Sequence, residues 1–422
     1  MEKRLFKNSG IFWQPFVPID WKVTRLKHIL KKLDRNRMPD DELLICSNSG
    51  EVKKRGDLKL GLVAESNDIY QGVKCGDLLI HGMDTWHGAI AVSQFDGMCT
   101  PVVHVCNTSQ NKGYIALYLR NMASQKIFKL ISNGVRQNTS DFRSWDKLGG
   151  IPIPIPSLVE QEKIVSYLED KTSKIDAYVA DKEKEIELLQ ELKQKTIADA
   201  VTKGLNPDAK MKDSGISWIG DIPEHWEVKR VASFLHERKE RYNGDETLGI
   251  LSLLKGIGII PYEDKGNLGN KAKEDLSTYK ITRKGDVVVN CMNVIIGSSG
   301  ITDYDGYISP AYYSFIPINK MMATLYKHWL SLPQMQGAIR CMAKGILEIR
   351  LRVSSQQLLS MKIPFPPQDE QQSIVVYIEE KCEKIAKLAS ELQSEIDYLK
   401  EYKQRLIADC VTGQVNVQNE MI

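Results

Sequence analysis

The stretch PFPPQDEQQSIVVYIEEKCEKIAKLASELQSEIDYLKEYKQRLIADCVTG, residues 364–413, determines the architecture because the chain contains it twice. Residues 154–203 match it without a gap at 22 of 50 positions. Farther out, KNSGIFWQPFVPIDWKVTR at 7–25 recurs as KDSGISWIGDIPEHWEVKR at 212–230, with nine identities in nineteen positions. Two such matches in 422 residues indicate an internal duplication, so the chain consists of two related halves.

The repeated stretches predict two long helices. A proline-rich segment precedes each one, IPIPIP at 151–156 and IPFPP at 363–367, and acidic residues follow where a first helical turn favours them. Apolar residues then alternate in steps of four and three, which is a heptad seam. The seam residues are Leu168, Thr172, Ile175, Val179, Lys182, Ile186 and Leu189, then Ile378, Cys382, Ile385, Ala389, Leu392, Ile396 and Leu399.

We expect the helices to end near Lys203-Gly204 and Thr412-Gly413, because glycine suits the position after a helix. Helices of roughly 40 residues with one apolar stripe need a partner, and the other long helix of the chain is the nearest candidate. The alternative is that each helix packs on its own globular neighbour. That alternative explains the first turns but not the full length.

Between the repeated motifs lie residues 27–150 and 232–362, which match only in patches such as Gly76-Asp77 with Gly285-Asp286. Short apolar runs, for example DLLIHGM and DVVVNCM, are typical of strands. Two longer stretches are typical of helices, residues 113–131 and residues 323–342, the second interrupted at Pro333. The sequence therefore predicts two α+β modules of one fold with diverged surfaces.

Composition and cysteine spacing limit the class of protein. Hydrophobic residues make up 42% and charged residues 26%, as in ordinary soluble proteins. There is no leader-like start and no apolar run near the roughly 18 residues that a membrane span needs, so we expect a cytoplasmic protein without a membrane partner. The eight cysteines form no CxxC pair, which favours reduced and mostly buried thiols over a zinc site or a disulfide framework.

Positive charge is separated from the predicted helices. Residues 1–159 carry 22 Lys and Arg against 15 Asp and Glu, and residues 204–367 carry 21 against 17, a sum of +11. Residues 160–203 carry 8 against 11, and residues 368–422 carry 6 against 11, a sum of −8. This separation favours contact between the two modules and a polyanion such as DNA, although ordinary surface scatter is the alternative.

The sequence shows no catalytic motif. There is no GxxxxGK[ST] loop, and the GxG at 256–258 is isolated. Asn206-Pro207-Asp208 does not match the Asn/Asp-Pro-Pro-aromatic motif of methyltransferases, and His81 and His87 have no metal-binding spacing. We therefore expect a non-enzyme without catalytic residues or a metal, while a nuclease centre of scattered carboxylates stays open.

Four motifs occur in one order in the chain: SGISWIGDIPEHWEVKR, IPFPP, EQQSIVVYIEE and IADCVTG. This combination, present twice over, resembles the specificity subunits of type I restriction-modification systems. The resemblance implies an α+β fold with two similar target recognition domains, residues 1–156 and 206–367. It also implies two long antiparallel coiled-coil helices, residues 157–205 and 368–416, an internal pseudo-twofold repeat and a tail at 417–422. One departure is PFVPIDW at 15–21, where the second half has GDIPEHW.

The resemblance also implies a function. Such a subunit has no catalytic activity and binds a bipartite site on double-stranded DNA. It directs two modification subunits, which methylate adenine with S-adenosylmethionine, and restriction subunits, which use ATP and Mg²⁺. The chain itself would bind no cofactor, and its location would be the bacterial or archaeal cytoplasm. The alternatives are a coiled-coil scaffold that binds proteins and a stand-alone nuclease.

DNA contacts are expected on the two recognition domains, with Lys and Arg on phosphates and loop side chains on base edges. The first-domain candidates are Lys53, Lys54 and Arg55, expected as a basic turn before Gly56, with Trp86, His87, Arg136, Gln137, Asn138 and Arg143. The second-domain candidates are Lys255, Lys265, Asn293, Lys344, Arg350 and Arg352. The alternatives are a solvated turn for residues 53–55, a core position for Trp86 and an exposed strand edge for the last two arginines.

The repeated motifs are expected to serve structure and partner binding. Trp21 and Trp226 are expected as core anchors beside the helix starts. The acidic helix faces, including Glu183, Glu187 and Glu391, are expected to be solvated. Because these helices carry net negative charge, we expect them to avoid DNA and to remain available to methyltransferase partners.

Overall fold

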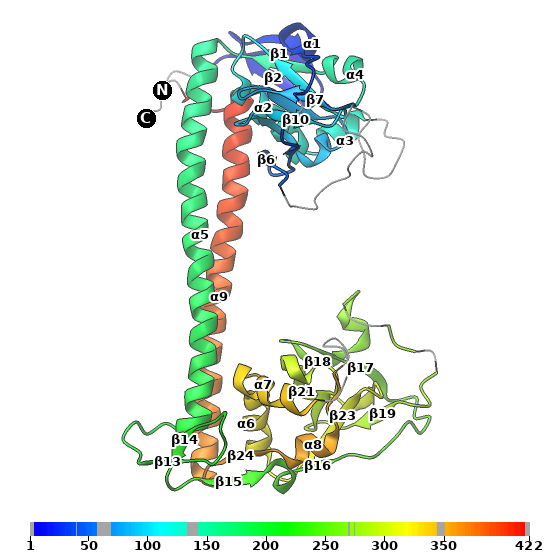
Figure 1. Cartoon of the computed structure of the whole chain (residues 1–422), viewed down its shortest axis with the longest axis vertical. Coiled ribbons are helices and arrows are strands. Elements are labelled where there is room, and N and C mark those ends of the chain that lie inside the picture. Colours follow the sequence, from blue (N-terminus) through cyan, green and yellow to red (C-terminus); the bar gives the residue numbers. More distant parts are fainter. Residues whose placement is uncertain are drawn as a thin grey trace. The chain divides into compact units, whose positions relative to one another are not determined.

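The computed structural model describes residues 4–38, 40–56, 69–132, 142–268, 271–273, 275–343 and 351–417. Its two longest helices are α5 (Leu158–Lys203) and α9 (Gln368–Val411). The chain divides into two compact units, a first unit of residues 1–183 with 393–422 and a second unit of residues 184–392. Each unit therefore contains one mixed domain, part of α5 and part of α9 (Figure 1).

Within the first unit, α5 and α9 run antiparallel. Lys403 contacts Asp176 at 2.5 Å, and Lys400 contacts Glu183 at 3.0 Å, so a later residue on α5 meets an earlier one on α9. The seam residues Leu168, Val179 and Ile396 are buried. The pairing predicted from the heptads is therefore confirmed.

The second unit has the same kind of helix pair. Ile378 of α9 shares one buried core with Ile197 of α5, and Ile385 is also buried.

The lysine that interrupts the predicted seam, Lys182, belongs to the first unit. Its ammonium lies 5.2 Å from the ring of Tyr178 and 3.8 Å from Glu395, so its charge has partners at the seam.

The domain of the first unit is built on a four-stranded antiparallel sheet of order β4-β11-β8-β9. Smaller strand pairs, β1-β2, β3-β12, β5-β6 and β7-β10, surround it. The strands are β1 (Phe6–Ile11), β2 (Gln14–Pro18), β3 (Lys22–Arg25), β4 (Lys31–Lys32), β5 (Leu44–Cys46), β6 (Val52–Lys54), β7 (Gln71–Val73), β8 (Leu78–His81), β9 (Ile90–Val92), β10 (Gly97–Cys99), β11 (Val103–Asn107) and β12 (Pro152–Ile155). The helices are α1 (Leu26–Ile29), η2 (Thr85–His87), α2 (Lys112–Ser124), α3 (Ile127–Ile131) and α4 (Trp145–Gly149).

The domain of the second unit repeats this sheet with the order β16-β23-β20-β21 and adds a second sheet, β18-β17-β22-β19. Pairs β13-β14 and β15-β24 correspond to β1-β2 and β3-β12. The strands are β13 (Met211–Asp213), β14 (Asp221–Pro223), β15 (Glu227–Arg230), β16 (Leu235–Glu237), β17 (Gly249–Leu254), β18 (Gly258–Pro261), β19 (Lys280–Thr282), β20 (Val287–Asn290), β21 (Ser299–Ile301), β22 (Gly306–Ile308), β23 (Tyr312–Pro317) and β24 (Lys362–Phe365). The helices are η3 (Val231–Ser233), η4 (Tyr262–Lys265), η5 (Val294–Ile296), α6 (Lys320–Leu330), α7 (Pro333–Met342) and α8 (Ser355–Ser360).

A repeated ion pair confirms that the two domains share one fold. Asp77 precedes β8 and contacts Arg35 at 2.6 Å, while Asp286 precedes β20 and contacts Arg238 at 2.6 Å. Both carboxylates are buried, and each also accepts a backbone N–H three residues upstream. A buried carboxylate needs such partners to stay charged, so these pairs fix the strand that follows in each domain.

The predicted helical stretches differ in one detail. Residues 113–131 form two helices rather than one, because Lys126 adopts a left-handed conformation with a φ of 59° between α2 and α3. Residues 323–342 lie in α6 and α7, with Pro333 in the first turn of α7. Proline is tolerated there because the first N–H groups of a helix have no intrahelical acceptor, so the predicted interruption is confirmed.

A buried tryptophan joins each leading motif to the start of a long helix. The indole N–H of Trp21 donates to Glu160 at 3.1 Å, and that of Trp226 donates to Glu370 at 2.9 Å. Both rings have no exposed surface. They are the core anchors that the repeated motifs predict.

The end of the other long helix completes each junction. Gly413, after α9, lies against the ring of Trp21, and Gly204, after α5, lies against the ring of Trp226. A Cβ atom at either glycine would come 3.1 Å from the indole, and both glycines have φ values above 70°. The helix ends predicted near these glycines are confirmed, and each glycine is required by both conformation and space.

The eight cysteines are free thiols, and five of them are buried: Cys46, Cys99, Cys106, Cys291 and Cys410. Burial raises the pKa of the Cys46, Cys99 and Cys106 thiols to about 12. These thiols are therefore neutral packing groups at ordinary pH.

No helix in the described part of the chain is both long enough and apolar enough to span a membrane.

Replacing Trp226 with alanine should destabilise the second unit. The change removes a fully buried ring and leaves Glu370 without its indole donor. We expect a loss of about 3–5 kcal/mol in unfolding free energy, measured by thermal unfolding of the whole chain. Tyr304→Ala, at an exposed position of the same unit, is the control and should change stability by less than about 0.5 kcal/mol. Equal effects of the two variants would contradict the anchor role.

The second unit should lose stability in acid because of His328. Burial, together with Lys327 and Lys193, lowers the pKa of this histidine from 6.5 to about 3. The folded state keeps the imidazole neutral while the unfolded state takes up a proton, so stability is full above pH 6.5 and falls as the pH drops towards 3. His328→Leu should flatten the dependence of the melting temperature on pH over this range. The exposed His87→Leu should not, and parallel curves for all three chains would refute the assignment.

Candidate nucleic-acid interface

Each domain presents a short turn at the end of its central strand. In the first domain β8 leads into η2, which ends at Gly88 with a φ of 79°. In the second domain β20 leads into η5, which ends at Gly297 with a φ of 80°. The left-handed glycine lets the chain reverse after three residues and return as the next strand. Side chains of this turn therefore lie at the same edge of the sheet in both domains.

An exposed arginine lies beside this turn in both domains. In the first domain the backbone of Phe142 and Arg143 runs so close to Gly82 that a Cβ atom there would come 2.9 Å from the Phe142 carbonyl oxygen. In the second domain the N–H of Val353, directly after Arg352, donates to the carbonyl of Cys291 at 3.1 Å.

The two arginines occupy equivalent positions. Arg143 and Arg352 are 209 residues apart, and Gly82 and Cys291 are also 209 residues apart. Both arginine side chains are exposed. Arginine in this setting can donate in a planar, bidentate manner to a base edge or a phosphate.

Trp86 and His87 lie in η2, in the same turn. The Trp86 ring is half-buried and packs against the core of the first domain, while the His87 side chain is exposed. The ammonium of Lys129 lies 5.9 Å from the indole centroid. The indole N–H is buried and has no hydrogen-bond partner among the described residues. The structure therefore gives Trp86 a position between the core and the surface.

The basic turn predicted at residues 53–55 is wrong in its local structure. Lys53 and Lys54 belong to strand β6, which pairs with β5, and Arg55 follows the strand. Lys53 contacts Glu51 and Lys54 contacts Glu42, each at 2.9 Å. Both pairs are solvent-exposed, where ion pairs contribute little, so they reduce the local positive charge without fixing the lysines. Glu42 could not be matched to Lys54 from the sequence, because the two residues are twelve positions apart and meet through the pairing of β5 with β6.

Five candidates lie outside the described residues. They are Arg136, Gln137, Asn138, Lys344 and Arg350.

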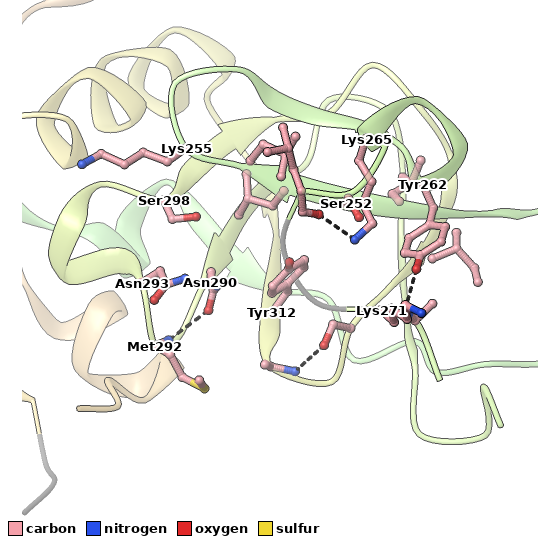
Figure 2. A pocket seen from close by; sticks show the side chains of 18 of the residues that line it. Ser252, Lys255, Tyr262, Lys265, Lys271, Asn290, Met292, Asn293, Ser298 and Tyr312 are labelled. Atoms are coloured by element: carbon pink, nitrogen blue, oxygen red, sulfur yellow. Dashed lines mark hydrogen bonds between the residues drawn. The ribbon is translucent and has the colours of Figure 1, made fainter. Parts of the chain in front are cut away.

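The second domain contains a cavity of about 330 Å³ that several candidates line (Figure 2). The exposed Lys255 extends from the β17-β18 turn, on the same side of the cavity as Asn290, Asn293 and Ser298 in Figure 2. Tyr312 stands between this group and a second group formed by Tyr262, Lys265 and Lys271. The cavity thus combines amide, hydroxyl and ammonium groups, which suit base edges and phosphates.

Lys265 points into the domain rather than to solvent. Its side chain is buried, its ammonium donates to the Leu268 carbonyl at 2.8 Å, and it lies 4.6 Å from the ring of Tyr262. Lys280, which sequence reasoning missed, is half-buried and donates to the carbonyl of the lining residue Tyr312 at 2.7 Å. Burial lowers the pKa of Lys280. Both lysines therefore organise the walls of the cavity.

A second cavity, of about 500 Å³, lies in the first unit between the domain and α9. Trp86, His87, Asn48 and Arg120 line it from the domain, and Lys403 is among the residues that line it from α9. The Arg120 guanidinium donates to the carbonyl of Ser49 at 2.7 Å, and burial lowers its pKa. Sequence reasoning missed Arg120 because it lies in the middle of a helical pattern, where charge indicates only a surface face.

The comparisons with known proteins agree with this architecture. Residues 223–397 match a protein-family model described as type I restriction modification DNA specificity domain. The type I restriction enzyme MjaVIII specificity subunit of Methanocaldococcus jannaschii is 23% identical over 96% of this chain and 95% of its own length. The type I restriction enzyme EcoBI specificity subunit of Escherichia coli is 25% identical over 63% of this chain and 59% of its own length.

A solved structure shows the same fold. The HsdS subunit from Thermoanaerobacter tengcongensis has a TM-score of 0.53 at 18% identity, and the likeness covers 94% of this chain and 98% of that subunit. The family match falls on the second half, and the first half repeats the second at 22 of 50 positions in its long helix. The resemblance stated from the sequence motifs is confirmed: the second half matches the type I restriction modification DNA specificity domain, and the chain is similar over most of its length to a specificity subunit of a type I restriction enzyme.

Proposed function

We propose that the chain is the DNA sequence-recognition subunit of a type I restriction-modification complex and binds a bipartite site on double-stranded DNA. Residues 1–156 and 206–367 form the two target recognition domains, and residues 157–205 and 368–416 form the helices that connect them. Of the tail expected at 417–422, Val417 is buried in the core of the first unit, and residues 418–422 lie outside the described residues. Each domain reads one half of the site, and an unread spacer separates the halves.

The equivalence of Arg143 and Arg352 carries this proposal. Both arginines lie beside the same turn of one fold, but the turns differ, with Trp86-His87 in the first domain and Ile295-Ile296 in the second. A shared arginine position supplies a common way to reach DNA. The side chains beside the two arginines differ, so the two domains would contact different base edges. We therefore expect two half-sites of unrelated sequence.

The other proposed contacts follow from exposure. Lys255 and Asn293 line the cavity of the second domain with exposed side chains, and His87 is exposed in the first. Lys53 and Lys54 would release their exposed carboxylate partners, Glu51 and Glu42, and contact DNA phosphates instead. Lys265 acts indirectly, by holding the loop at Leu268. Arg136, Gln137, Asn138, Lys344 and Arg350 remain proposed contacts on chemical grounds alone.

The partners follow from the family. Two modification subunits bind the chain and methylate adenine with S-adenosylmethionine, and restriction subunits join them with ATP and Mg²⁺. The chain contributes recognition and no catalytic group, and it acts where the DNA is, in the cytoplasm. The relatives do not support the two alternatives, a protein-binding scaffold and a stand-alone nuclease.

Methylation mapping tests the function directly. The chain is co-expressed with the methyltransferase subunit encoded beside it, and methylated adenines are mapped genome-wide by single-molecule sequencing. We expect one motif made of two short sequences with a fixed gap. A continuous motif, or no methylation despite a stable complex, would contradict the proposal.

The two arginines should affect different halves of that motif. Arg143→Gln should weaken discrimination at one half-site by about 1–3 kcal/mol and leave the other unchanged, and Arg352→Gln should do the reverse. Binding is measured at fixed salt on duplexes with one altered half. Arg25→Gln and Arg230→Gln are matched controls, because these exposed arginines are identical in the two repeats and should not distinguish sequences. A uniform loss on all duplexes would instead indicate phosphate contacts.

A further inference from the structure

The turn at the end of the central strand carries different side chains at one equivalent position of the two domains. Asp84 precedes η2 and Asn293 precedes η5, and they are 209 residues apart, the offset that also relates Arg143 to Arg352. Their backbones agree closely, with φ and ψ of −107° and 18° at Asp84 and of −109° and 4° at Asn293. Side chains on matching backbones leave the chain in the same direction. The two domains therefore present a carboxylate and an amide from one position.

Backbone hydrogen bonds hold the two residues in the same way. The carbonyl of Asp84 accepts the N–H groups of the residues three and five positions later, at 3.0 and 3.3 Å. The carbonyl of Asn293 accepts the N–H groups at the same two positions, each at 3.0 Å. These bonds use main-chain groups only, so either side chain can change without loss of the turn.

The carboxylate of Asp84 is available to a ligand. It is 42% exposed, and no group in the described part of the chain donates a hydrogen bond to it. The nearest charged neighbour is His81, whose Nδ1 lies 3.3 Å from the carboxylate. That nitrogen already accepts the backbone N–H of Asp84 at 3.0 Å, and burial lowers the pKa of His81, so Nδ1 carries a lone pair rather than a proton. The carboxylate therefore needs a donor from outside the chain.

A free carboxylate limits what this part of the surface can meet on DNA. Phosphates repel it, and a carboxylate accepts hydrogen bonds without donating any. In the major groove the only donors are the amino groups of cytosine and adenine. The amino group of adenine lies beside the N7 acceptor, which repels a carboxylate, whereas that of cytosine has no acceptor at its exposed side. Cytosine is therefore the base that Asp84 fits best.

Asn293 has the complementary chemistry. Its side chain is exposed and lines the cavity of the second domain, on the same side as Asn290 and Ser298 in Figure 2. Asn290 is the counterpart of His81, and its amide oxygen accepts the backbone N–H of Met292 at 3.1 Å. Among the described residues the Asn293 amide has no hydrogen-bond partner. An amide with a free donor and a free acceptor matches N6 and N7 of adenine.

We propose that Asp84 and Asn293 are equivalent base-reading residues, and that Asp84 selects a C·G pair in one half-site while Asn293 selects an A·T pair in the other. This inference rests on the proposed function. It names two specificity-determining side chains on one shared backbone, so that one atom group decides which base pair each domain accepts. Sequence reasoning missed Asp84 because an acidic residue does not by itself suggest contact with a polyanion.

Exchanging the two side chains tests the proposal. The full chain, in complex with the modification subunit encoded beside it, is mixed at fixed salt with a pool of duplexes of random sequence, and the bound duplexes are sequenced. The original chain should select a two-part motif with C·G at one position of the half-site that Arg143→Gln weakens. Asp84→Asn should change that position to A·T and lower the preference for C·G there about tenfold. Asn293→Asp should change one A·T of the other half-site to C·G.

Matched controls carry the same chemical changes outside the turn. They are Asp40→Asn in the first domain and Asn267→Asp in the second, both at exposed positions, and each should leave the motif unchanged.

The outcomes separate this inference from the proposed function. If Asp84 only repelled phosphates, Asp84→Asn would raise affinity for every sequence and leave the motif as it was, which would overturn the base-reading role. A two-part motif without C·G in the first domain's half-site would overturn it as well. If the original complex selected no two-part motif, the proposed function itself would fail. A two-part motif that neither exchange alters would refute only the two base-reading residues.

Discussion

The hydrogen bond between a buried indole and the carboxylate at a helix start is the contact on which the remaining structure depends. Glu160 is almost fully buried, which would be costly for an isolated charge, and it is balanced by the Trp21 indole and by the guanidinium of Arg4. Glu370 is less buried and has Trp226 and His225 as partners. Each junction thus fixes the direction in which a long helix leaves its domain.

The junction also joins segments that are far apart in the chain. In the first unit Gln14 donates to the carbonyl of Thr412, and the Tyr114 hydroxyl donates to the carbonyls of Pro154 and Val411. The end of α9 is therefore part of the first domain's core, so this unit is complete only when the last helix has been made. Such non-local contacts slow folding but bind the start and the end of the chain into one cooperative unit.

The helices and the junction could be predicted from the sequence because they rest on periodic or repeated signals. Heptads predicted the seam, glycines predicted the helix ends, and repetition singled out Trp21 and Trp226. The candidate site was less predictable. The strand at Lys53 and Lys54 and its ion pair with Glu42 depend on tertiary pairing, and Lys265 is drawn inward by the Leu268 carbonyl. The equivalence of Arg143 and Arg352 needed the register of the two folds, since the sequence around them has diverged.

Because the chain is duplicated, each position in one half can be compared with its equivalent in the other. Features that both halves keep, such as the junction tryptophans and the Asp77 and Asp286 pairs, serve needs that the halves share. Features that differ beside a kept position, such as the turns next to Arg143 and Arg352, serve needs that are specific to each half.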